Sequence, residues 1–101
     1  MINLSDINSP LYSQDGKGDD KVIVAKLFAL GSGATWYVTE FDPEDRLIFS
    51  YVTGLQEDEW GYASLEELES LKYGPIPRIE RDEYWTPITW GELKGKVGAM
   101  R

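Results

Sequence analysis

Residues 35–71 read TWYVTEFDPEDRLIFSYVTGLQEDEWGYASLEELESL, and this stretch decides the fold. Residues 35–42 and 46–53 are rich in β-branched and aromatic side chains, which favour strands. Between them lies Asp42-Pro43-Glu44-Asp45. Aspartate suits the first position of a turn, and proline pre-sets φ at the second. The stretch therefore predicts an antiparallel β-hairpin.

Side chains alternate between the two faces of a strand, so the pattern also predicts which residues share a face. In the first strand, Trp36 and Val38 fall on one face, and Thr35, Tyr37, Thr39 and Phe41 on the other. In the second, Leu47, Phe49 and Tyr51 are expected to oppose Ile48, Ser50 and Val52. Both faces carry large residues, which predicts a central or doubly covered hairpin.

After the hairpin, residues 59–63 predict a short strand, and Ser64-x-x-Glu67 has the pattern of a capping box. Leu65, Leu68 and Leu71 form one apolar stripe of a helix over residues 65–71. We expect Phe49 from the sheet and Leu68 from this helix to be buried in a shared core.

The flanking segments complete an α+β domain with a mainly antiparallel sheet of about four strands and one or two short helices. Residues 21–30 predict a buried strand, and residues 79–85 predict an extended segment that suits an edge strand. Either Thr86-Pro87 or Thr89-x-x-Glu92 opens a last short helix. A chain of 101 residues predicts one domain over residues 1–101. Residues 1–20 are expected to be partly irregular, and residues 86–101 to form a C-terminal helix or tail.

Three strings carry a resemblance to a known family: TWYVTEFDPED at 35–45, GYASLEELES at 61–70 and IERD at 79–82. Over about residues 10–85 the chain resembles a family of small bacterial proteins known only as a domain of unknown function, number twenty-nine fifty-eight in that series. The resemblance implies a protein of plasmids, phages and other mobile elements, often encoded near conjugation and antirestriction genes. It implies no activity and no catalytic residue. The chain departs from the family pattern at Arg46, where glycine is common, and in its C-terminal WGELKGKVGAMR.

The charge is concentrated in the middle of the chain. The formal net charge is −8, and residues 35–71 alone hold ten acidic residues and one basic residue, a net charge of −9. Direct binding to nucleic acid needs cations that displace counterions, so we do not expect it. We also expect no membrane association, because the apolar run near residues 22–30 is too short to span a bilayer. A start without signal-peptide features and the absence of cysteine predict a cytoplasmic protein.

The residue types predict neither catalysis nor a cofactor. Without histidine or cysteine, a serine or threonine nucleophile would lack its usual base. The segment from Asp15 superficially suggests a calcium loop, but its twelfth residue is Lys26 rather than glutamate, so we expect no metal site. Arg81, within Glu80-Arg81-Asp82, is expected to form a bidentate ion pair with a carboxylate such as Glu40 or Glu67. A structural role of this pair is favoured over a binding role, and both stay open.

The sequence therefore predicts a binding protein, and two hypotheses describe its binding. In the first, a mobile element's acidic protein binds a basic surface of a host protein and mimics nucleic acid as an inhibitor of a defence system, of the anti-restriction or anti-CRISPR type. In the alternative, an accessory module of plasmid maintenance or conjugation binds protein partners through an apolar-aromatic patch around Trp60. The candidate binding residues are Glu44, Asp45, Glu57, Asp58, Glu59, Trp60, Glu66 and Glu69. For Trp60 a place in the core is an equal alternative, because aromatic side chains suit strands.

Overall fold

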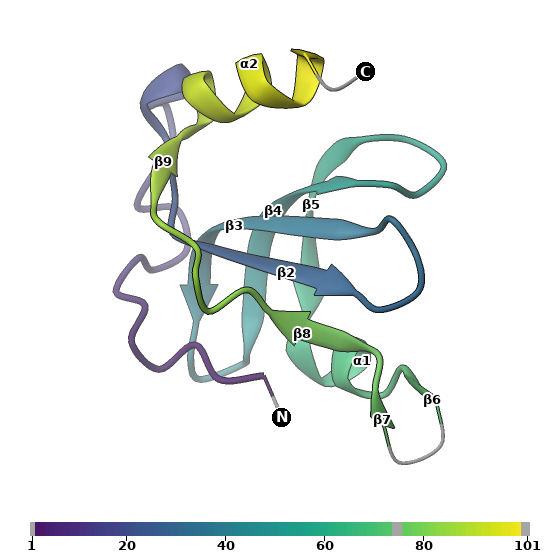
Figure 1. Ribbon diagram of the computed structural model, residues 1–101. Helices are drawn as coiled ribbons and strands as arrows, with labels where there is room; N and C mark the ends of the chain where they lie inside the picture. Colours follow the sequence, from purple (N-terminus) through teal and green to yellow (C-terminus); the bar gives the residue numbers. More distant parts are fainter. Residues whose placement is uncertain (1, 74–75, 100–101) are drawn as a thin grey trace.

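The computed structural model describes residues 2–73 and 76–99, and its main element is a five-stranded antiparallel sheet (Figure 1). The strand order is β5-β4-β3-β2-β8. The elements along the chain are η1 (Gly18–Asp20), β1 (Val22–Ile23), β2 (Ala25–Ala29), β3 (Thr35–Asp42), β4 (Leu47–Thr53), β5 (Glu59–Ser64), α1 (Leu65–Glu69), β6 (Lys72–Tyr73), β7 (Ile76–Pro77), β8 (Ile79–Arg81), β9 (Ile88–Thr89) and α2 (Trp90–Ala99).

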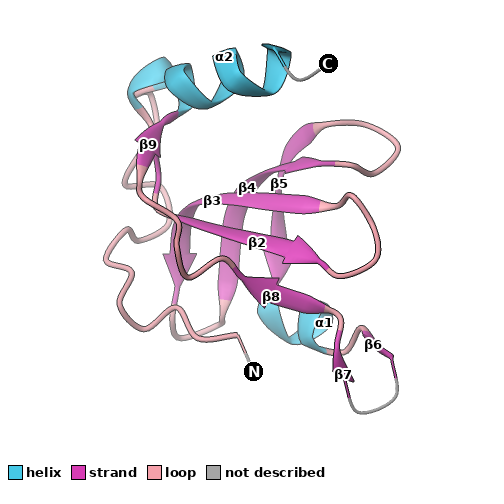
Figure 2. Ribbon diagram, in the orientation of Figure 1, coloured by secondary structure: helices cyan, strands magenta, loops and turns pink. Residues whose placement is uncertain are grey.

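The predicted α+β class and the mainly antiparallel sheet are confirmed. Two further pairs, β1 with β9 and β6 with β7, lie beside the main sheet. Figure 2 shows that the two helices occupy different places, with α1 at the level of β8 and α2 beyond β9. The predicted strand over residues 21–30 is divided at Val24, because its first part pairs with β9 while β2 joins the main sheet.

The predicted hairpin forms β3 and β4, and its turn has the expected local contact. The backbone N–H of Glu44 donates to Asp42 Oδ1 at 3.1 Å. Arg46 closes the turn at φ +53°, a left-handed conformation that glycine adopts most readily. A glycine, which the resemblance implies at this position, would adopt this conformation without strain.

A β-bulge in β3 makes one part of the predicted face assignment wrong. The register shifts between Val38 and Glu40, so that Phe41 pairs with Ile48 and Glu40 pairs with Phe49. Phe41 therefore lies on the core face, with Trp36 and Val38, rather than on the opposite face. A bulge has this effect because one extra residue reverses the alternation beyond it.

The core lies on the face of the sheet that carries Leu27, Val38 and Ile48, each fully buried. Helix α1 covers this face with Leu65 and Leu68, and the N-terminal segment adds Ile2 and Leu4. Burial of each large aliphatic side chain stabilises the fold by about 1.5–3 kcal/mol. The prediction that Leu68 is buried is confirmed, but Phe49 lies half-buried on the other face, so Ile48 takes its expected place in the core.

The two predicted capping boxes have different outcomes. Helix α2 begins after Thr89, whose Oγ1 accepts the backbone N–H of Glu92 at 3.2 Å. Ser64 makes no side-chain capping bond to α1, which ends at Glu69 rather than at Leu71. Leu65 N–H donates instead to the carbonyl of Arg46 at 2.9 Å. The stabilisation of about 1 kcal/mol expected from a serine cap has no hydrogen bond to supply it.

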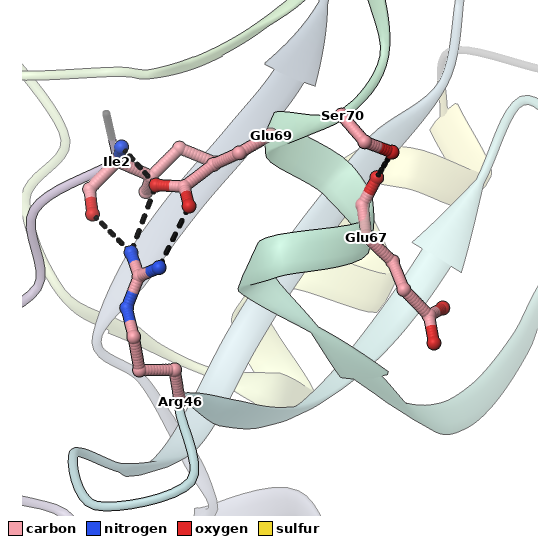
Figure 3. Close-up of polar contacts among 5 residues, drawn as sticks. All are labelled: Ile2, Arg46, Glu67, Glu69 and Ser70. Atoms are coloured by element: carbon pink, nitrogen blue, oxygen red, sulfur yellow. Dashed lines mark hydrogen bonds and ion pairs between the residues drawn. The ribbon is translucent and has the colours of Figure 1, made fainter.

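An ion pair between the hairpin turn and α1 holds the N-terminus of the chain (Figure 3). The Arg46 guanidinium donates to Glu69 Oε1 at 2.7 Å and to Oε2 at 2.8 Å. Ile2 completes the cluster, because its N–H donates to Glu69 and its carbonyl accepts from Arg46. The Arg46 guanidinium, and after it the Ile2 N–H, hold the pKa of Glu69 below its ordinary value of 4.5.

This lowered pKa predicts a pH-dependent contribution to stability. A carboxylate with a depressed folded pKa stabilises the fold above its unfolded pKa, and the contribution is lost as pH falls through the folded pKa. At neutral pH we expect the wild-type protein to have a larger free energy of unfolding than the Glu69→Gln variant. This difference in unfolding free energy should shrink as the pH falls from about 5 to about 3. Urea unfolding of both proteins across this range measures it. A difference that stays constant with pH would contradict the role of the Glu69 charge.

Candidate functional site

Strand β5 forms one edge of the main sheet and carries the candidate residue Trp60. Because Leu65 N–H bonds the Arg46 carbonyl, the alternation of an antiparallel ladder makes Ile48–Ala63 and Ser50–Gly61 the hydrogen-bonded pairs. The backbone groups of Trp60, Tyr62 and Ser64 then point away from β4. The N–H groups of all three residues and the carbonyls of Trp60 and Tyr62 have no backbone partner within the described residues, whereas the Ser64 carbonyl accepts the first N–H of α1. The edge therefore presents three N–H donors and two carbonyl acceptors.

The same alternation brings large rings together on the face opposite the core. Directly opposed residues that are not hydrogen-bonded to each other stand closest, and Tyr51–Trp60 and Phe49–Tyr62 are two such pairs. Their ring centroids are 5.3 Å and 4.8 Å apart. Trp60 also stacks on Phe49 at 5.4 Å and meets Trp90 of α2 at 4.9 Å. Trp60 is therefore a half-buried centre that fixes a rigid aromatic cluster.

Two large apolar side chains next to this cluster are exposed. Leu55 in the β4–β5 loop is 59% exposed, and Tyr62 on β5 is 54% exposed. Both line a groove of about 650 Å³ that also contacts Glu57, Glu59 and Trp60. Desolvation and then the neighbouring Tyr12 hydroxyl raise the pKa of Tyr62 above its ordinary value of 10.0. The groove thus combines apolar contacts, a hydroxyl, two carboxylates and an open strand edge.

The candidate acidic residues divide between two ends of the sheet. Glu57 and Glu59 are exposed beside the groove, whereas Asp58 is half-buried and engaged in a contact within the protein. Glu44 and Asp45 are exposed in the β3–β4 turn, and Glu66 and Glu69 belong to α1, which begins beside that turn. Seven residues of β4 separate the ends by roughly 20 Å.

The structure therefore groups Glu57, Glu59 and Trp60 and sets the other acids apart from them. Glu69 is committed to Arg46 and Ile2, which gives it a structural role. Sequence reasoning missed Leu55 and Tyr62. The period of two could have placed Tyr62 beside Trp60 on one face, but no local signal shows that β5 is an edge.

The predicted ion pair of Arg81 forms with a different partner. Arg81 donates to both carboxylate oxygens of Asp6, at 2.6 Å and 2.9 Å, rather than to Glu40 or Glu67. It also donates to the Asn3 carbonyl at 2.9 Å. The bidentate geometry predicted for Arg81 is confirmed, and it ties the N-terminal segment to β8.

The described part of the chain has neither a cluster of metal-ligand residues nor a membrane-spanning helix. In residues 2–73 and 76–99, no three histidine, cysteine, aspartate or glutamate residues gather in a way that could hold a metal ion. Across these same ranges, no helix is both long enough and apolar enough to cross a membrane.

Comparison with known proteins yields one match. A family model described as a protein of unknown function, DUF2958, matches residues 6–90. This range contains the sheet, α1 and the groove beside β5. No curated protein and no solved structure matches the chain.

Proposed function

Because the chain belongs to the DUF2958 family of proteins of unknown function, we infer its role from its own surface, and we propose that it is a non-catalytic protein-binding module. Its partner is a protein of the host or of the mobile element. An extended segment of that partner adds to the open edge of β5. The observation that carries this proposal is the row of outward backbone groups at Trp60, Tyr62 and Ser64 beside exposed Leu55 and Tyr62.

Each feature of the edge has a separate part in binding. Backbone hydrogen bonds to an added strand contribute about 0.5–1.5 kcal/mol each and are independent of partner sequence. Leu55 and Tyr62 supply apolar contact area, and the rigid cluster below Tyr62 reduces the entropy lost on binding. Glu57 and Glu59 attract a basic partner and so raise the association rate.

The nucleic-acid-mimicking inhibitor is the second candidate, and the charge of residues 35–71 is the observation in its favour. A mimic needs carboxylates along one continuous surface. The separation of Glu44 and Asp45 from Glu57 and Glu59 by roughly 20 Å favours the binding module instead.

The proposal is tested by matched variants at Tyr62. Tyr62→Pro removes the ring and the outward N–H, whereas Tyr62→Ala removes only the ring, and neither changes a hydrogen bond to β4. Partner proteins are first captured from the host with the wild-type protein and identified by mass spectrometry. The association and dissociation rates of each partner are then measured with both variants. We expect Tyr62→Pro to bind about three- to tenfold more weakly than Tyr62→Ala, which corresponds to one lost hydrogen bond. Equal binding by the two variants would contradict strand addition.

A pair of charge reversals separates the two candidate functions. Glu57→Lys with Glu59→Lys changes the charge beside the groove, and Glu44→Lys with Asp45→Lys makes the same change at the other end of β4. If the partner docks at β5, the first pair should slow association at low salt, and the second pair should have little effect. Equal slowing by both pairs would instead favour mimicry over the whole acidic surface.

A further inference from the structure

The other edge of the main sheet, strand β8, is also open. Leu30 N–H donates to the Arg78 carbonyl, and Asp82 N–H donates to the Lys26 carbonyl. In an antiparallel ladder every second residue faces its partner strand, so the backbone N–H and carbonyl of Glu80, midway between Arg78 and Asp82, point toward β2. The N–H and carbonyl groups of Ile79 and Arg81 point away from β2. Within the described part of the chain, neither residue has a backbone partner on that outer side.

A groove of about 950 Å³ follows this edge. It is lined by Asn3 and Asp6 of the N-terminal segment and by Phe28, Glu80 and Tyr84. The groove thus reaches both faces of β8, which leaves space for a further strand. Figure 1 shows β8 at the margin of the sheet with the N-terminus of the chain near it.

The carboxylates of the groove divide into paired and unpaired groups. Asp6 is neutralised by Arg81, and Asp82 lies 3.9 Å from the Lys26 ammonium group. Glu80 and Glu83 also line the groove, are exposed, and form no ion pair with any described residue. Tyr84, at 96% exposure, adds an uncovered aromatic ring. The free charge of the groove is therefore negative, and an aromatic face lies beside it.

We propose that the β8 edge binds an extended basic peptide, in which lysine or arginine alternates with apolar residues. A residue of this peptide opposite Glu80 lies on the same face as Phe28, within reach of the two free carboxylates and the Tyr84 ring. Carboxylates and an aromatic face both attract a cationic side chain. The peptide residues on either side of it point to the opposite face, toward the apolar stem of Arg81 and the small exposed parts of Ile2 and Ile79, where an apolar side chain packs.

Charge favours this occupant over a second copy of the chain. Both open edges carry exposed carboxylates, Glu57 and Glu59 beside β5 and Glu80 and Glu83 beside β8. Edge-to-edge pairing of copies would bring like charges together, which is a common protection of edge strands. A basic peptide turns the same charges into an attraction. This site is distinct from the β5 edge, so it stands or falls independently of the proposed function.

The probe for this proposal is a short synthetic peptide in which lysine and valine alternate, compared with one in which glutamate and valine alternate. We expect saturable binding of the lysine peptide and none of the glutamate peptide. Amide hydrogen exchange followed by NMR locates the site. The N–H groups of Ile79 and Arg81 should become protected, while Glu80 N–H, already directed toward β2, should change little. Binding of both peptides, or protection at Trp60 and Tyr62 instead, would overturn the proposal.

Two sets of variants test the separate parts of the site. Glu80→Gln with Glu83→Gln should weaken the lysine peptide about three- to tenfold, whereas Glu44→Gln with Asp45→Asn, far from both edges, should leave its affinity unchanged. Arg81→Pro should bind more weakly than Arg81→Ala, because only proline lacks the outward N–H. An unchanged affinity in the Glu80 and Glu83 variant would overturn the proposal even if Arg81→Pro fails to fold.

Discussion

Replacing Gly54 with alanine is expected to destabilise the protein by about 4 kcal/mol or more, a large part of the 5–15 kcal/mol typical of a folded domain. Gly54 follows β4 at φ +83°, where any side chain is strained by about 1–2 kcal/mol. A Cβ there would also lie 2.0 Å from the Gly33 carbonyl oxygen and 2.4 Å from its carbon. Both are backbone atoms of the β2–β3 turn, so the contact is relieved only by separating two parts of the sheet. Urea unfolding measures the loss.

Gly31 provides the matched control. It has φ +78°, close to the value at Gly54, but a Cβ there would meet nothing within 4 Å. Gly31→Ala should therefore cost only the backbone strain of about 1–2 kcal/mol. If the two alanine variants unfold with the same free energy, the close approach of Gly54 to Gly33 makes no contribution to the cost.

The second large effect is expected at Glu40, whose side chain is 1% exposed. Its Oε1 accepts the backbone N–H of Tyr12 and its Oε2 accepts that of Gln14, each at 2.9 Å. Glu40→Gln replaces one of these acceptors with an NH₂ group, which faces a donor. A lost hydrogen bond to a charged group, with a buried donor left unsatisfied, should cost about 3 kcal/mol. The melting temperature should fall by roughly 10–20 °C.

Glu44→Gln is the control for this change, because Glu44 is exposed in the β3–β4 turn. The same chemical replacement there should alter the unfolding free energy by no more than about 0.5 kcal/mol. A stable Glu40→Gln protein, with a melting temperature equal to that of Glu44→Gln, would show that the carboxylate does not hold the 10–22 segment.

The anchoring by Glu40 also explains why the partly irregular start of the chain is ordered where it meets the sheet. Gln14 is buried, its Nε2 donates to the carbonyls of Val22 and Thr39, and its Oε1 accepts Val22 N–H. These contacts join residues far apart in sequence. Nothing in the composition of residues 12–20 indicates them, since polar residues and glycines are equally typical of an unanchored loop.

Features carried by neighbouring residues could be predicted from the sequence. The turn at Asp42-Pro43, the hairpin and the short helix after Ser64 depend on local conformational preferences, and the structure contains all three. Trp60 and the acids beside it were also identified locally. Leu68 was predicted as buried because the apolar stripe of a helix is visible in its spacing.

The bulge in β3 could not be predicted in this way. It turns Glu40 toward the N–H groups of Tyr12 and Gln14 while it turns Phe41 toward the core. Strict alternation would place Glu40 on the core face with Trp36 and Val38, away from these donors. The need for the bulge arises from a segment more than twenty residues away, and no residue of β3 itself signals it. The same shift is what makes Ile48 the partner of Phe41, opposite it on the core face.

The sequence alone determined the α+β class, the hairpin and the concentration of charge in residues 35–71, because these follow from composition and short-range periodicity. The tertiary structure alone decided that β5 is an edge strand, which carboxylate pairs with Arg81 and how the acids divide over the surface. Arg81 and Asp6 are 75 residues apart, and β8 reaches the edge only because it pairs with β2. Strand order depends on the joint packing of all segments on one core. The two open edges, and with them both proposed binding sites, therefore exist only in the folded protein.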